Sequence, residues 1–125
     1  MTKVSKDTAA RHEDHGPVEE WSQDVDGWNI EFVRFGVDMD AAPLLKGLPD
    51  DRCPCPHWGY VLSGRVVFTF ADHEEAHEAG DAFYVPGGHL QRVDAGTEYL
   101  QFSPAEALQV VSDTVMRNFR ALQGA

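Results

Sequence analysis

Two cysteines and a histidine occupy alternate positions in the segment 52–64, and their types and spacing could support metal chemistry. Side chains alternate along an extended chain, so Cys53, Cys55 and His57 would project from one face. Thiolates and imidazoles are typical ligands of transition metals. The two intervening prolines stiffen the segment and disfavour a helix. The segment therefore predicts a metal site carried on a rigid, extended chain.

The spacing limits which of these side chains can share one ion. Residues two apart on a strand have Cα atoms roughly 6.5 Å apart, and residues four apart roughly 13 Å, which is too far for metal–ligand bonds of about 2.0–2.3 Å. Cys53 can therefore join His57 only if the prolines bend the segment strongly, and otherwise Cys55 and His57 form the pair. Thiolates favour zinc and also admit iron or copper. The alternative is that both thiols are small buried apolar groups.

Two other sequence patterns provide weaker evidence of function. The sequence from His73 to His77 matches the His-Glu-x-x-His pattern of zinc proteases, which requires a helix. It lies instead between a strand pattern and the turn residues Gly80 and Asp81, so we expect a solvated loop. A redox switch formed by the two cysteines is disfavoured, because a Cys-x-Cys disulfide closes a small strained ring.

Short apolar segments separated by turn residues surround the candidate site. They are rich in aromatic and branched side chains, which is typical of strands. The predicted strands cover residues 28–37, 60–63, 65–71, 74–79, 82–85, 90–93 and 98–102, with a connector at 41–49. Short strands at this spacing predict an all-β fold, either a sandwich or a small antiparallel barrel.

The period of the apolar residues changes after residue 103. Ser103 to Glu106 has the pattern of a capping box with proline at the first helical position. Apolar residues then recur every three or four positions, at Leu108, Val111, Val115, Phe119 and Leu122. We expect a helix over about 104–122 that covers an open side of the barrel or packs on a partner subunit.

The composition is that of an ordinary globular protein, with 125 residues, 42% hydrophobic and 25% charged. We expect a mobile tail at 1–17 and a single domain at 18–125. The net charge of −11 disfavours nucleic acid and anionic membranes as partners. No apolar run approaches the roughly 18 residues of a membrane span, and the N-terminus has no apolar signal segment. The expected location is the cytoplasm, where free thiols persist.

The glycine and proline positions resemble the first of the two motifs of the cupin family. That motif ends in a glycine, here Gly64, and counting back places His57 in the slot of its glutamate. Its first two ligand slots fall near Asp51 and Cys53, where the family usually has histidines.

The second cupin motif is matched by Gly80, Pro86 and Gly88. Its final ligand slot holds Gln91, and a histidine, His89, lies two residues earlier. The resemblance covers roughly residues 28–103 and implies a small antiparallel jelly-roll barrel with ligands in its mouth. It also implies that His89 lies beside the first motif. The usual set of three histidines and one glutamate is absent, so the iron or manganese chemistry of the family does not carry over intact.

These observations lead to two functional hypotheses. The first is a small metal-binding cupin, most simply with zinc, that acts on a small molecule in the barrel mouth. Its ligands would be His57, His89, Cys55 and Cys53, with Asp51 and Gln91 as substitutes. Polar pocket candidates are Tyr60, Gln91 and Tyr99. The alternative is a non-catalytic binding or sensing cupin with a structural metal, which forms a homodimer through its C-terminal helix.

Overall fold

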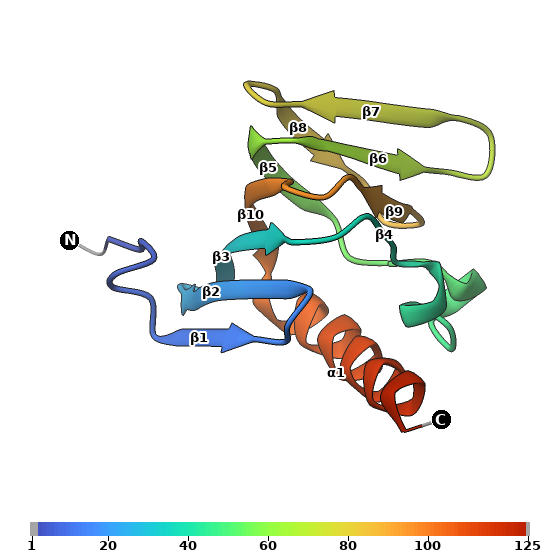
Figure 1. Cartoon of the computed structure of the whole chain (residues 1–125), viewed down its shortest axis with the longest axis horizontal. Coiled ribbons are helices and arrows are strands. Elements are labelled where there is room, and N and C mark those ends of the chain that lie inside the picture. Colours follow the sequence, from blue (N-terminus) through green and yellow to red (C-terminus); the bar gives the residue numbers. More distant parts are fainter. Residues whose placement is uncertain (1–2, 125) are drawn as a thin grey trace.

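A computed structural model describes residues 3–124 as two antiparallel β-sheets followed by a long helix (Figure 1). One sheet has six strands in the order β1-β2-β3-β10-β5-β8, and the other has four in the order β4-β9-β6-β7. The strands are β1 (Arg11–Asp14), β2 (Val18–Val25), β3 (Trp28–Phe35), β4 (Met39–Asp40), β5 (His57–Ser63), β6 (Arg65–Thr69), β7 (Glu74–Glu78), β8 (Ala82–Val85), β9 (Leu90–Val93) and β10 (Glu98–Pro104). The expected all-β jelly-roll architecture with a C-terminal helix is confirmed.

The core lies between the two sheets and comes from the alternation of buried and exposed residues along the strands. In β3, for example, Val33 and Phe35 are buried while Arg34 between them is exposed. The core consists of Val33, Phe35, Val61, Val66, Phe68, Phe83, Val85, Val93 and Tyr99. Gly59 allows this packing, because a Cβ atom there would lie 2.2 Å from the ring of Phe83.

The helix α1 (Ala105–Gln123) begins directly after β10 and matches the expected helix closely. No side chain caps its N-terminus, so the expected capping box does not form. The helix packs against the short 3-10 helix η1 (Ala42–Leu44), which lies within the predicted connector. Together they cover a second apolar cluster that consists of Leu45, Leu48, Cys53, Cys55 and Val111. The helix therefore covers an open side of the barrel, one of its two expected positions.

The strands β1 and β2 differ from expectation. Arg11–Asp14 was assigned to a mobile tail, but it pairs with β2 in regular antiparallel register. The prediction failed because β1 is polar and exposed throughout, so it has no apolar alternation. Backbone pairing at the edge of the sheet forms this strand without a buried side chain.

One further local expectation is corrected. His77 belongs to β7 and packs against Phe68 and Phe83, so the expected solvated loop is wrong for this residue. The same strand excludes the helical context that a protease motif needs. Trp58 and Tyr84 lie on the outer face of the six-stranded sheet, where they are 44% and 47% exposed. In the described part of the chain, no helix combines the length and apolarity needed to cross a membrane.

Candidate metal centre

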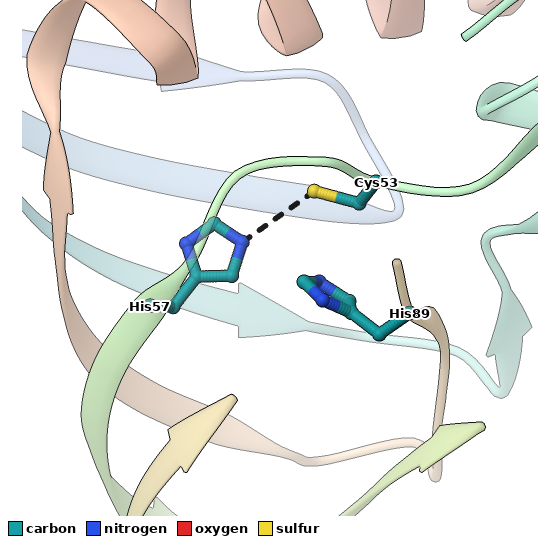
Figure 2. A group of neighbouring side chains, drawn as sticks. All are labelled: Cys53, His57 and His89. Atoms are coloured by element: carbon teal, nitrogen blue, oxygen red, sulfur yellow. Dashed lines mark hydrogen bonds between the residues drawn. The ribbon is translucent and has the colours of Figure 1, made fainter. Parts of the chain in front are cut away.

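One thiol and two imidazoles converge at one end of the barrel (Figure 2). One possible ligand atom from each of Cys53, His57 and His89 lies within 4.8 Å of the other two, and all three residues are buried. The Sγ atom of Cys53 is 3.6 Å from Nε2 of His57. The two imidazole rings lie 5.1 Å apart, with their planes inclined by 69°. The expected meeting of the two motif segments is present in this group, which could hold a metal ion.

The backbone brings the two motif segments together. The amide of Cys53 donates to the carbonyl of His89 at 2.9 Å, and the amide of Gly88 donates to the carbonyl of Cys53 at 2.7 Å. This close approach requires glycine at position 87, because a Cβ atom there would lie 2.2 Å from the carbonyl oxygen of Pro54. The Pro-Gly-Gly sequence thus positions His89 by allowing direct contact between the two backbones.

The segment 53–57 brings Cys53 and His57 into contact although they lie four residues apart, with Sγ and Nε2 separated by 3.6 Å. Just before Cys53, Asp50 and Asp51 adopt positive φ values of 57° and 54°. Asp51 accepts a hydrogen bond from the amide of Gly47 and does not join the group. Since residues four apart on a straight strand are too far from each other for the contact between Cys53 and His57, the bend expected of the proline-containing segment is present.

Hydrogen bonds orient both imidazoles. Nδ1 of His89 donates to the carbonyl of Pro86 at 2.9 Å, and since a carbonyl can only accept, Nε2 keeps its lone pair. Nδ1 of His57 lies 2.7 Å from the hydroxyl of Ser103, which is fully buried. That contact leaves Nε2 of His57 directed towards Cys53. Such contacts to the nitrogen remote from the metal are typical of histidine ligands.

Burial keeps all three groups neutral. It lowers the pKa of His57 to about 3, with a further contribution from His89, and it also lowers the pKa of His89. Burial raises the pKa of the Cys53 thiol to about 11. Neutral imidazoles are ready to coordinate a metal, whereas the thiol must first lose its proton.

The donor set suits a tetrahedral transition metal, and the separation of one donor pair matches that geometry. Zn–S bonds of about 2.3 Å and Zn–N bonds of about 2.0–2.1 Å place the two donor atoms roughly 3.6 Å apart at a tetrahedral angle. This is the separation between Cys53 Sγ and His57 Nε2. Cys55 lies outside the group, and its thiol contacts the carbonyl of Pro56 at 3.4 Å. The arrangement therefore offers three ligands, one fewer than the sequence predicted.

The three donors line a cavity of about 410 Å³ between the inner face of the six-stranded sheet and α1. Gln91 and Tyr99 also line it, and Nε2 of Gln91 donates to the Tyr99 hydroxyl at 2.9 Å. Tyr60, the third pocket candidate, points to the outer face of β5 and is 43% exposed. Its position next to Val61, which is buried, could have indicated this orientation.

The sequence analysis missed the polar residues on the inner face of β2, β3 and β10. Glu20, Glu31 and Gln101 line the same cavity, and Nε2 of Gln101 donates to Oε1 of Glu31 at 2.6 Å. The sequence could have indicated the position of Glu31, since this residue alternates with Val33 and Phe35 and so belongs to the buried face of its strand.

Comparison with known proteins identifies the fold. The chain matches the polyketide cyclase RemF from Streptomyces resistomycificus with a TM-score of 0.60 and 15% identity over 84% of this chain and 80% of that one. It matches an RmlC-like cupin from Shewanella frigidimarina with a TM-score of 0.56 and 18% identity over 84% and 93% of the two chains. A cupin superfamily protein from Desulfitobacterium hafniense gives a TM-score of 0.54 and 15% identity over 82% and 98%.

The chain has the cupin fold. No protein-family model and no curated protein sequence matches it. At these identities the likeness concerns the fold alone, and the chemistry of the chain has to be argued from its own residues.

Proposed function

We propose that this small cupin binds a divalent transition metal, most simply zinc, through Cys53, His57 and His89, and acts on a small molecule in the adjoining cavity. The observation that carries the proposal is a set of three converging donors on the wall of a cavity of about 410 Å³. Ligand sites commonly have volumes of roughly 300–1,000 Å³. Three protein ligands beside a cavity are typical of catalytic rather than structural zinc.

The protein residues have separable roles in this proposal. A zinc ion at this position would supply Lewis acidity towards an oxygen atom of the bound molecule. Ser103 and the carbonyl of Pro86 fix the orientation of the two imidazoles. Gln91 and Tyr99, joined by their hydrogen bond, provide polar contacts on the cavity wall. The apolar side chains of α1 exclude water from the opposite wall.

Metal analysis of matched variants tests the proposal. Cys53 and Cys55 are both buried thiols two residues apart, so they form a natural pair of test and control. We expect Cys53→Ser, His57→Ala and His89→Ala to lose stoichiometric zinc, and Cys55→Ser to retain it. After cobalt substitution, the thiolate-to-cobalt absorption band should persist in Cys55→Ser and disappear in Cys53→Ser. Absence of metal from the unmodified protein, or its loss in Cys55→Ser alone, would contradict the proposal.

The second candidate function is a non-catalytic sensing cupin with a structural metal. A structural site needs a closed set of four ligands. The position of the Cys55 thiol against the carbonyl of Pro56 disfavours that set. An ion without exchangeable water, detected by relaxation of solvent protons after cobalt substitution, would favour this alternative.

We also propose that two copies of the chain pair through the outer face of the six-stranded sheet. Six large side chains there are 38–47% exposed and uncharged, and we call them the aromatic face: Trp28, Trp58, Tyr60, Leu62, Tyr84 and Phe102. Together they expose on the order of 500 Å² of largely apolar surface, given the roughly 150–250 Å² of a single aromatic side chain. With its rim, such a face approaches the roughly 800 Å² per partner of a standard interface.

The charge of the chain supports a second copy as the occupant of this face. The net charge of −11 opposes the approach of two copies, and this opposition is weakest where the surface carries no charge. By contrast, α1 exposes only Val110 and Leu122 among its large apolar side chains. The aromatic face is therefore a better candidate for dimerisation than the helix. A cytoplasmic location, finally, is proposed from the two free cysteines.

A further inference from the structure

Two carboxyl groups meet in the cavity on the side of β2 and β3. In the sheet, Ser22 lies opposite Glu31, so Glu20 is the diagonal neighbour of Glu31 on the same inner face. Both side chains line the cavity, and the charge of Glu20 acts on Glu31. Glu31 is only 8% exposed and accepts the hydrogen bond from Gln101, while Glu20 is half-buried. This pair stands apart from the three metal-binding candidates, none of which lies near it in sequence.

Two carboxyl groups that are buried beside each other disfavour ionisation of both at once. Burial, together with the charge of Glu20, raises the pKa of Glu31 to about 8. Burial also raises the pKa of Glu20. The pair therefore holds one proton near neutral pH, as adjacent carboxyl groups commonly do.

An unpartnered acceptor lies beside the pair. Asn29, two residues before Glu31 on the same face of β3, is 4% exposed and lines the cavity. Its Nδ2 donates to Oδ1 of Asp24 at 2.9 Å, whereas its Oδ1 is buried and has no hydrogen-bond partner among residues 3–124. Buried polar atoms are rarely left unpaired in native proteins. This end of the cavity thus offers more acceptors than donors, which suits a ligand with N–H or O–H groups.

The surrounding charges favour a cation over a neutral donor. The titratable and charged side chains around the pair come from β1, the following turn, β2, β10, α1 and the cysteine segment: Arg11, Glu13, His15, Asp24, Tyr99, Asp113 and Cys55. The single arginine among them is already bonded to Asp24 and Ser22. On the opposite wall, α1 contributes the apolar side chains of Leu108, Val115, Met116 and Phe119 together with the polar Gln109, Ser112 and Asp113.

We propose that Glu20, Glu31 and Asn29 form a carboxyl subsite that binds a protonated primary amine carried on an apolar chain, and that the pair releases its shared proton to solvent on binding. The ammonium group would donate to both carboxylates and to Oδ1 of Asn29, and the apolar chain would lie against α1. One proton leaves as the cation enters, and no bond to carbon is made or broken. This subsite rests on the proposed function, because it lies in the cavity that is proposed to hold the small molecule. A protonated primary amine is then the chemical class of that molecule.

Three probes with the same tail test the subsite: hexylamine, 1-hexanol and hexanoate. Their binding to the full-length protein is followed by NMR of glutamate labelled with ¹³C at the side-chain carboxyl carbon. We expect hexylamine to shift the signals of Glu20 and Glu31 and to bind at least roughly tenfold more tightly than the other two, as a charged hydrogen bond implies. Equal binding of 1-hexanol, preferred binding of hexanoate, or no change in either signal would overturn the proposal.

Variants identify the residues involved. Glu31→Gln and Glu20→Gln should each weaken hexylamine binding by roughly tenfold or more. Glu19→Gln is the matched control, because Glu19 neighbours Glu20 on the outer face of β2, where it contacts His12 and Arg34. It should bind hexylamine as the unmodified protein does. Equal losses of hexylamine affinity in all three variants would contradict the assignment of Glu20 and Glu31 to the subsite. The titration of the unmodified protein does not depend on how any variant folds.

The pH dependence gives an independent signature. Below about pH 8, where Glu31 is protonated, hexylamine affinity should rise about tenfold per pH unit, and above that pH it should level off. A flat profile from pH 6 to 8 would exclude proton release.

The zinc content of the variants separates this test from the test of the proposed function. Glu31→Gln should keep its zinc while losing the amine, whereas His57→Ala should lose its zinc whatever the amine does.

Discussion

Cys53 and His89 are joined by an isolated antiparallel bridge, in which the Cys53 amide donates to the His89 carbonyl at 2.9 Å. The bridge links two segments that are separated by four strands in the sequence, and it holds one proposed ligand from each segment beside the other. The position of the candidate metal centre thus depends on backbone pairing as well as on side chains.

Substitution of Gly87 should disturb this bridge. In Gly87→Ala the new Cβ atom would meet the carbonyl oxygen of Pro54 at 2.2 Å, so the two segments must separate. We expect a loss of roughly 1–3 kcal/mol in the free energy of unfolding, as overpacking commonly causes, together with weaker zinc binding. Denaturant unfolding and a chelator competition would measure both effects.

Gly36→Ala is the matched control for Gly87→Ala. Its Cβ atom would lie 3.8 Å from the carbonyl oxygen of Pro17, an ordinary contact, and Gly36 has no positive φ. The control should keep both its stability and its zinc affinity. If Gly87→Ala behaved in the same way, the close approach of the two segments would not be needed for the site.

The sequence predicted the strands of the fold wherever an alternation of apolar and polar residues is bounded by turn residues. The glycine and proline positions that match the cupin motifs are backbone requirements, and they predicted the barrel although the usual ligand set is absent. The helix over 105–123 was predicted from apolar residues that recur every three or four positions. The strand β1 could not be predicted, because its residues are exposed and its pairing with β2 leaves no apolar pattern.

The sequence predicted which types of residue form the candidate site, but it predicted their spatial arrangement less well. Spacing alone left open whether Cys53 or Cys55 accompanies His57, since the answer depends on how the segment 53–57 bends, and only the structure shows the contact between Cys53 and His57. The contact between Ser103 and His57 was hidden for another reason. Ser103 resembles a helix cap in sequence, but its position at the end of β10 directs its hydroxyl towards the imidazole.

Metal affinity should depend on pH through Cys53. Both imidazoles are already neutral at pH 7, because burial lowers their pKa values, that of His57 to about 3. The thiol, with its pKa raised to about 11, must lose one proton when zinc binds. Zinc affinity should therefore rise about tenfold per pH unit between about pH 7 and 9, as measured by competition with a chelator of known proton dependence. In Cys53→Ser this dependence should vanish, and a steep rise that persisted would assign the proton to another group.

The hydroxyl of Ser103 should tune zinc binding through His57. In Ser103→Ala, Nδ1 of His57 loses its contact at 2.7 Å, so the ring is less firmly oriented. Loss of such a contact typically lowers metal affinity about 10–100-fold. Ser63→Ala is the control, because that exposed hydroxyl donates to the carbonyl of Gly96, away from the site. Isothermal titration with zinc should separate the two variants, and equal affinities would show that Ser103 has no orienting role.

The aromatic face provides the last test, in which the sheet and the helix compete as dimer contacts. Trp58 lies within this face and packs against Trp28 and Tyr84 with ring centroids 5.6 and 4.7 Å away. Trp58→Lys would place a charge among these rings, and we expect the dimer dissociation constant to rise about 100-fold or more, the effect of a central interface residue. Val110→Lys is the counterpart on α1, at a position that is 59% exposed. Sedimentation velocity over a range of concentrations should find Val110→Lys as dimeric as the unmodified protein and Trp58→Lys monomeric. The reverse result would assign the interface to the helix, and a monomeric unmodified protein would remove the proposed dimer altogether.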